Sequence, residues 1–122
     1  MGLEITEQGE IVIYTFIDSA DVYVEQWAES IETLFKDTPA MQPLYVMVDV
    51  SSPDVEFTAL ARQKSAEIFP RYRNHRGRVA FVFSGVTAPY YARIFFAGLG
   101  ILNFEVEFFD SREAGLAWLE GA

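Results

Sequence analysis

The chain has 122 residues, of which 51% are hydrophobic, so it is long enough for one packed core and too short for two ordinary domains. It contains no cysteine and one histidine, which excludes disulfides, cysteine-ligated metals, thiol catalysis and a multi-histidine metal site. Its net charge of −9 argues against a general affinity for nucleic acid, because nucleic-acid-binding domains normally carry a basic surface. We therefore expect one domain, spanning residues 1–122, with no metal and no cofactor.

The amino-terminal half alternates between the two hydrophobic periods of regular secondary structure. Alternating apolar residues predict strands at 3–6 and 11–17, and Gln8-Gly9 is placed for a hairpin turn between them. A helix is predicted from Ala20 to Lys36, because the start signal Asp18-Ser19 precedes apolar residues at three-and-four spacing. The first three predicted elements are therefore two paired strands and an amphipathic helix.

The next elements are a strand and a helix. The continuous apolar run at 44–50 is typical of an interior strand covered on both faces. A second helix is predicted from Pro53 or Phe57 to Phe69, and it should end near Pro70 because proline lacks an amide donor. The remaining elements are a strand at 78–84, a helix at 88–102 capped by Thr87, a strand at 104–109 and a helix at 111–119 capped by Ser111.

The resulting order, ββαβαβαβα, places helical crossovers between successive strands. Crossovers of this kind join parallel strands, whereas the tight amino-terminal turn joins antiparallel ones. The sequence thus predicts an α/β fold with a mixed, mostly parallel five-stranded sheet, an amino-terminal antiparallel hairpin and four helices.

Three segments carry a resemblance to a known family: Val46–Ser51, Arg78–Val82 and Val106–Leu119. With the element order, they resemble the SpoIIAA-like family of the STAS superfamily across nearly the whole chain. The most recognisable part is the last segment, in which a phenylalanine-aspartate turn leads into an alanine-rich helix ending in Trp118-Leu119. The resemblance implies an α/β sandwich, also likened to the CRAL-TRIO lipid-transfer fold, in a bacterial, soluble and often uncharacterised protein without established enzymatic activity.

The same resemblance raises the question of a phosphorylation site. STAS antagonists of anti-sigma factors carry a phosphorylatable serine or threonine directly after an aspartate, followed by a glycine, where a helix begins after the third strand. Here Asp49 is followed by Val50, Ser51, Ser52 and Pro53, so the motif is displaced and lacks the glycine. Two interpretations stay open: Ser52 caps the second helix with Pro53 at its first position, or Ser51 or Ser52 is phosphorylated.

The third predicted helix, 88–102, is apolar or aromatic around almost its whole circumference. A surface helix needs only one buried stripe, so an apolar face is left over. Three interpretations stay open: Ile101 and Leu102 turn into the core and leave a modest patch, the helix forms a homodimer interface, or it contacts an apolar ligand or a membrane edge. The candidate contact residues are Tyr90, Tyr91, Ile94, Phe95, Phe96 and Leu99.

Charge is unevenly distributed, because residues 59–93 carry seven bases and one acid whereas both flanking parts are acidic. Candidate anion contacts within this basic segment are Arg93, Arg71, Arg73 and Arg76. The alternative is neutralisation within the molecule, for which the first helix offers the acidic series Asp21, Glu25, Glu29 and Glu32. For Arg93, stacking on an aromatic ring is a further interpretation.

Catalytic patterns are weak. His75 has no recognisable nucleophile and orienting acid, and Asp49, at the end of a central strand, more often caps a turn. The segment 88–102 is also too short and too interrupted for a transmembrane helix, and Met1 to Glu4 does not resemble a secretory signal, which predicts a cytoplasmic location.

We therefore expect no enzyme. The favoured interpretation is a non-catalytic STAS-like protein-interaction module that dimerises through the third helix. The alternative is a carrier or sensor of a small apolar or lipid-like ligand. The third choice is an anti-sigma-factor antagonist that meets a regulatory protein partner.

Overall fold

The structure, a computed structural model, describes residues 2–85, 87–100 and 102–121, and only the backbone of residues 87 and 88. The strands are β1 (Leu3–Gln8), β2 (Ile11–Phe16), β3 (Leu44–Asp49), β4 (Gly77–Val82) and β5 (Glu105–Phe109). The helices are α1 (Asp21–Asp37), α2 (Ala59–Arg71), α3 (Thr87–Ala97) and α4 (Arg112–Glu120). One sheet has the order β1-β2-β3-β4-β5, with β1 and β2 antiparallel and the other neighbours parallel. The predicted element order and sheet type are confirmed.

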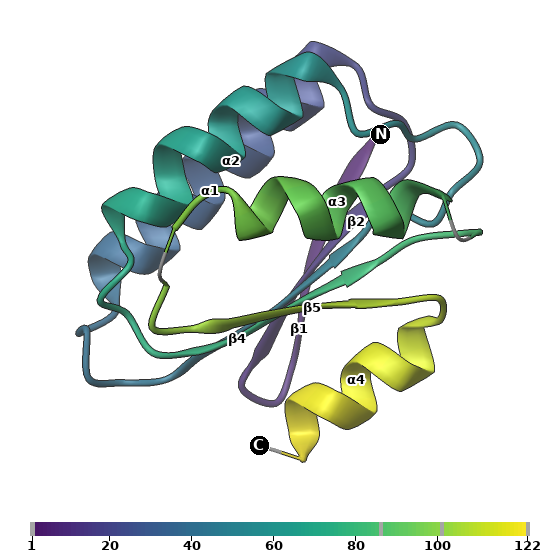
Figure 1. Cartoon of the computed structure of the whole chain (residues 1–122). Helices are drawn as coiled ribbons and strands as arrows, with labels where there is room; N and C mark the ends of the chain where they lie inside the picture. Colours follow the sequence, from purple (N-terminus) through teal and green to yellow (C-terminus); the bar gives the residue numbers. More distant parts are fainter. Residues whose placement is uncertain (1, 86, 101, 122) are drawn as a thin grey trace.

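The sheet is covered on both faces. Helices α1, α2 and α3 lie on one face and α4 lies on the other (Figure 1). The core on the three-helix face is rich in phenylalanine, whereas the smaller core beneath α4 contains Met47, Val82 and Leu119. Strand β3 lies at the centre of the sheet, and Val46, Met47 and Val48 are all at most 2% exposed. Burial on both faces explains why this strand is a continuous apolar run.

The hairpin and the first helix are close to their predicted bounds. Gly9 has φ +60°, the left-handed conformation that favours glycine, in the turn after β1. The predicted start signal of α1 is used differently from expected. Asp18 Oδ1 accepts a hydrogen bond from the Ala20 amide at 3.0 Å, but Ser19 Oγ accepts one from the distant Glu56 amide at 3.1 Å. Ser19 therefore holds a loop instead of capping the helix.

The predicted start of the second helix at Pro53 is wrong, and the alternative start at Phe57 is two residues early. Ser52 does not cap it, because the Val55 amide donates to the Ser52 carbonyl at 3.1 Å and closes a turn there. The helix begins at Ala59, after Thr58 Oγ1 accepts a hydrogen bond from the Ala61 amide at 3.1 Å. Its end lies one residue beyond Pro70, because a proline in the last turn removes only one donor.

The third helix is shorter than predicted. It ends at Ala97, and the Gly98 amide bonds both the Ile94 and Phe95 carbonyls, at 3.2 and 3.1 Å. The predicted cap Thr87 and the predicted core residue Ile101 lie outside the side chains that the structure describes. The predicted cap of α4 is confirmed, because Ser111 Oγ accepts a hydrogen bond from the Ala114 amide at 3.2 Å. Within the described residues no helix is long and apolar enough to cross a bilayer.

Candidate ligand-binding site

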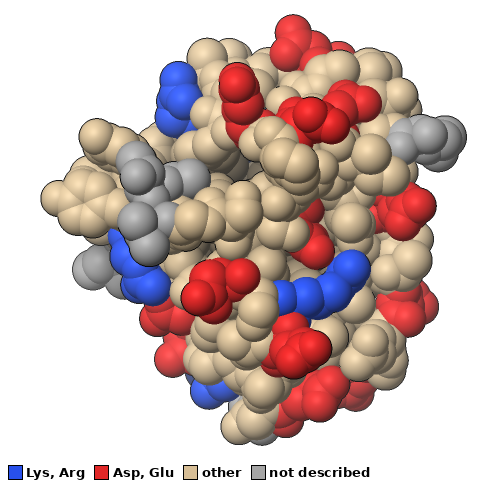
Figure 2. All heavy atoms as spheres, turned by 90° about the vertical axis from the view of Figure 1, so that its right-hand side faces the viewer, with Lys and Arg blue, Asp and Glu red and all other residues tan. Residues whose placement is uncertain are grey.

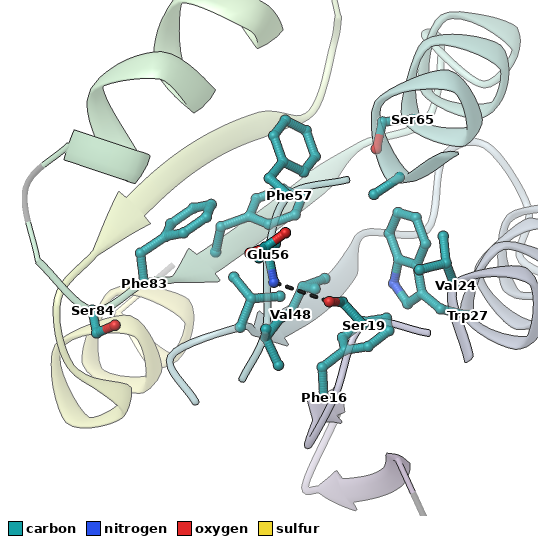
Figure 3. A pocket seen from close by; sticks show the side chains of 14 residues that line it. Phe16, Ser19, Val24, Trp27, Val48, Glu56, Phe57, Ser65, Phe83 and Ser84 are labelled. Atoms are coloured by element: carbon teal, nitrogen blue, oxygen red, sulfur yellow. Dashed lines mark hydrogen bonds between the residues drawn. The ribbon is translucent and has the colours of Figure 1, made fainter. Parts of the chain in front are cut away.

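A cavity of about 290 Å³ lies on the three-helix face, near the carboxyl ends of the parallel strands. Strands β2, β3 and β4 contribute Phe16, Val48 and Phe81 to its wall, and helices α1 and α2 contribute Trp27 and Ser65. A further part of the wall comes from the segment 50–57, which connects β3 to α2. Figure 3 shows these lining side chains around the cavity. Open α/β sheets commonly bind ligands at this end of their strands.

Two polar atoms in the cavity wall have no hydrogen-bond partner among the described residues. They are the indole Nε1 of Trp27 and the hydroxyl Oγ of Ser65, and their residues are only 3% and 1% exposed. A buried polar group without a partner costs about 1–3 kcal/mol. Both residues line the same cavity, so their side chains are the wall groups on which a molecule bound there would find a hydrogen-bond partner.

The segment 50–57 is held over the cavity by contacts to the loop before α1 and to α3. Its Glu56 amide donates to Ser19 Oγ just before α1, as the dashed line in Figure 3 shows. Its Phe57 ring packs edge-on against Phe95 of α3, with ring centroids 5.4 Å apart, and lies 6.5 Å from Phe96. The cavity wall and α3 therefore share one aromatic cluster.

The candidate phosphorylation residues lie just outside this cavity, in the loop after β3. Ser51 Oγ and the Ser51 amide donate to the buried Asp49 Oδ1, at 2.6 and 3.0 Å, so Asp49 caps the turn as one interpretation held. Ser52 Oγ donates to the Ile17 carbonyl at 3.4 Å. Arg112 lies 3.6 Å from Asp49 Oδ2. Because α2 begins at Ala59, neither serine adjoins a helix amino terminus.

The six candidate contact residues in and just after α3 separate into three groups by exposure. Tyr90, Tyr91 and Ile94 are 62%, 64% and 55% exposed, so they form an apolar patch on the surface. Phe96 is buried in the core on the three-helix face, with its ring 5.0 Å from that of Phe81. The others, Phe95 and Leu99, are half-buried and pack against that core. An exposed apolar patch is therefore present, but only three of the six candidate residues form it.

Arg93 is engaged within the molecule. Its guanidinium pairs with Glu107 Oε1 at 2.6 Å, donates to the Phe108 carbonyl at 3.3 Å and lies 5.2 Å from the centre of the Phe108 ring. These contacts match the predicted aromatic stacking. They leave fewer donors for an external anion.

The basic segment is partly neutralised by α1. Arg71 forms an ion pair with Glu32, and the Tyr72 hydroxyl donates to the same carboxylate at 3.2 Å. Burial works to raise the pKa of Glu32, but these hydrogen bonds and the charges of Arg71 and Lys36 outweigh it and lower the pKa. The pKa of Tyr72 is raised, by burial and by the Glu32 charge. One member of the predicted acidic series is therefore the partner of the basic segment.

The other candidate anion contacts are not gathered into one site. Arg73 Nε donates to the Pro70 carbonyl at 2.9 Å, and Arg76 is exposed. His75 lies at the carboxyl end of α1, where its Nε2 is 2.8 Å from the Phe35 carbonyl and 3.1 Å from the Thr38 carbonyl. Carbonyl oxygens only accept, so Nε2 carries the hydrogen and His75 caps that helix end.

Sequence reasoning placed Trp27 on a buried stripe but did not single out Ser65. A signal for Ser65 was present, because Ala61, Ser65 and Ile68 recur at spacings of four and three on the buried side of α2. A serine in phase with such a stripe must find a partner or remain unsatisfied. No set of three or more metal-binding side chains gathers among the described residues.

No protein-family model matches the chain, and no curated protein matches its sequence. Its fold is similar to that of a solved structure, an uncharacterized protein from the DUF3478 family with a SpoIIAA-like fold from Shewanella loihica PV-4. The two are 15% identical, the TM-score is 0.68, and the match covers 96% of this chain and 91% of the other. An identity this low supports a statement about fold alone. The chain therefore has the SpoIIAA-like α/β fold that the sequence resemblance implied.

Proposed function

We propose that this chain is a non-catalytic binding protein for a small amphiphilic molecule, held in the cavity between α1, α2 and the ends of the parallel strands. The observation that carries the proposal is the pair of unpartnered polar atoms, on Trp27 and Ser65, in an otherwise mostly apolar wall. Ligand pockets are typically apolar clefts with a few polar groups that fix orientation. The cavity of about 290 Å³ lies near the lower end of the range of about 300–1,000 Å³ for such pockets.

The size of the cavity sets the size of the ligand. It is roughly twice the ~150 Å³ apolar cavity that admits benzene in another protein, so a ligand of about a dozen non-hydrogen atoms fits. Straight-chain 1-decanol is a suitable probe, since it combines an apolar chain of the right size with one oxygen.

The test is a calorimetric titration of the purified protein with 1-decanol. Ala61 lines the cavity, so Ala61→Leu fills part of it and should weaken binding at least tenfold. Ala66 is exposed on the same helix, so Ala66→Leu is the matched control and should bind like the wild type. Absence of binding by the wild type, or equal affinities of Ala61→Leu and wild type, would overturn the proposal.

A second candidate function, homodimerisation, is favoured by the patch formed by Tyr90, Tyr91 and Ile94. These three large side chains are each more than half exposed on one helix. Sedimentation velocity at several concentrations should show a dimer that Ile94→Glu converts to a monomer. Met41→Glu, at a residue 71% exposed outside the patch, is the control. A wild-type monomer at all concentrations would refute the dimer.

Phosphorylation of Ser51 or Ser52 has less support. A phosphate on Ser51 would stand beside the Asp49 carboxylate, which is already bonded to that serine, and like charges repel. Arg112, 3.6 Å from that carboxylate, is the counter-charge that favours a modification there.

A further inference from the structure

The chemistry of the cavity wall restricts which head group its ligand carries. Among the lining residues that the structure describes, Glu56 is the only one that ionises at neutral pH, and it is exposed. Arg62 touches the wall only from outside, where it donates to the Phe57 carbonyl at 2.7 Å and lies 5.9 Å from the Phe57 ring. No cation therefore stands in the described wall to pair with a buried anion.

The surface around this end of the sheet also disfavours an anionic ligand. Figure 2 views the molecule from the right-hand side of Figure 1, where β4 and β5 end, and acidic side chains outnumber basic ones there. A negative surface raises the free energy of an approaching anion. A carboxylate buried in the cavity without a partner would also lose its hydration, which costs several kcal/mol.

A cationic head group is disfavoured as well, because Glu56, the one carboxylate among the described lining residues, is exposed, so a buried ammonium would lose its hydration without an ion-pair partner. The indole N–H of Trp27 is a donor only, so its partner must be an acceptor, and an ammonium has no lone pair to offer. The Ser65 hydroxyl donates or accepts, so it tolerates either role. An uncharged oxygen, as in an alcohol, ester or ketone, accepts from the indole N–H or from the serine hydroxyl without burying a charge.

Building on the proposed function, we infer that the ligand is an uncharged amphiphile whose oxygen is hydrogen-bonded by Trp27 Nε1 or by Ser65 Oγ. Its apolar body lies against the aromatic and aliphatic side chains of the wall, such as Phe16, Val48 and Phe81. Ionised fatty acids and alkylammonium ions of the same length are discriminated against.

The test uses the full chain and three ligands that share one alkyl chain: 1-decanol, decanoate and decylammonium, each titrated at pH 7.5. The expected result is that 1-decanol binds at least tenfold more tightly than either ion. Decanoate or decylammonium binding as tightly as the alcohol overturns the inference but leaves a ligand-binding cavity in place. Absence of binding by all three ligands overturns the proposed function as well.

Variants then test the hydrogen bond and the charge. Ser65→Ala or Trp27→Phe, whichever removes the group bonded to the ligand oxygen, should weaken 1-decanol binding about fivefold, the value of one hydrogen bond. Ser65→Ala keeps the test valid if the larger change at Trp27 impairs folding. Glu56→Lys should raise the affinity for decanoate relative to that for 1-decanol by about threefold. Unaltered 1-decanol affinity in Ser65→Ala and in folded Trp27→Phe overturns the assignment of the oxygen site.

Discussion

The change Ser65→Ala should stabilise the ligand-free protein. Ser65 is 1% exposed, and its hydroxyl has no partner among the described residues. Removing that hydroxyl therefore relieves a penalty of about 1–3 kcal/mol. Alanine is also the better helix former by about 0.5 kcal/mol. After the loss of a few packing contacts, we expect the free energy of unfolding to rise by about 1 kcal/mol or more.

Ser30→Ala is the matched control, because it is the same substitution inside a helix. Ser30 Oγ lies 2.9 Å from the hydroxyl of Tyr14, which is 1% exposed. Burial raises the pKa of Tyr14, and the hydrogen bond from Ser30 partly opposes the shift, so the two groups are coupled. Removing Ser30 leaves a buried hydroxyl unsatisfied and should lower the free energy of unfolding by about 1 kcal/mol after the propensity gain.

Urea unfolding followed by circular dichroism measures both changes on one scale. The two variants should differ by about 2 kcal/mol in opposite directions, and helix propensity cancels in the difference. Destabilisation by Ser65→Ala equal to that by Ser30→Ala would show that Ser65 is satisfied without a ligand. That result would refute the reasoning that the cavity wall carries an unpaired group.

Three further predictions concern the rest of the fold. The lowered pKa of Glu32 means that its pairing stabilises the fold at neutral pH and that this stabilisation is lost as the pH falls below 4.5. Glu32→Gln should therefore lower the free energy of unfolding in urea by up to about 1 kcal/mol at pH 7, whereas Glu32→Gln in acid and Glu29→Gln at pH 7 should leave it unchanged. His75→Phe keeps the ring but loses the donor at the end of α1, so thermal unfolding should show a loss of about 1–2 kcal/mol. Gly77 has φ +130° and a Cβ there would overlap the Leu44 carbonyl oxygen, so Gly77→Ala should lose more than about 2 kcal/mol, again by urea unfolding.

Much of the fold was predictable because hydrophobic period and turn residues act locally. The apolar run from Leu44, the hairpin glycine Gly9 and the cap Ser111 each determine their element through nearby backbone geometry. The start of α2 was not predictable in this way. Serine is intrinsically the better N-cap, yet Thr58 caps the helix and Ser52 does not, because the choice depends on a turn and on contacts to residues far along the chain.

The candidate site was harder to predict, because it is built from long-range packing. Trp27 and Ser65 look like ordinary members of two buried stripes, and only the packed structure shows that neither polar atom has a partner among the described residues. Arg93 is the opposite case, because it looks unpartnered in the sequence and has partners in the fold. A lone arginine on an apolar helix invites an external anion, whereas in the fold Glu107 and Phe108 engage it. Partners distant in sequence decide which polar groups are free.

The most direct test of the account is the NMR signal of the tryptophan indoles during titration with 1-decanol. The chain has two tryptophans, and Trp118 packs against Phe109 and Arg78 in the region of the α4-side core, so it serves as an internal reference. We predict that the Trp27 indole N–H signal, identified from its loss in Trp27→Phe, moves to saturation while the Trp118 signal stays in place. An unmoved Trp27 signal, or equal movement of both, would contradict it.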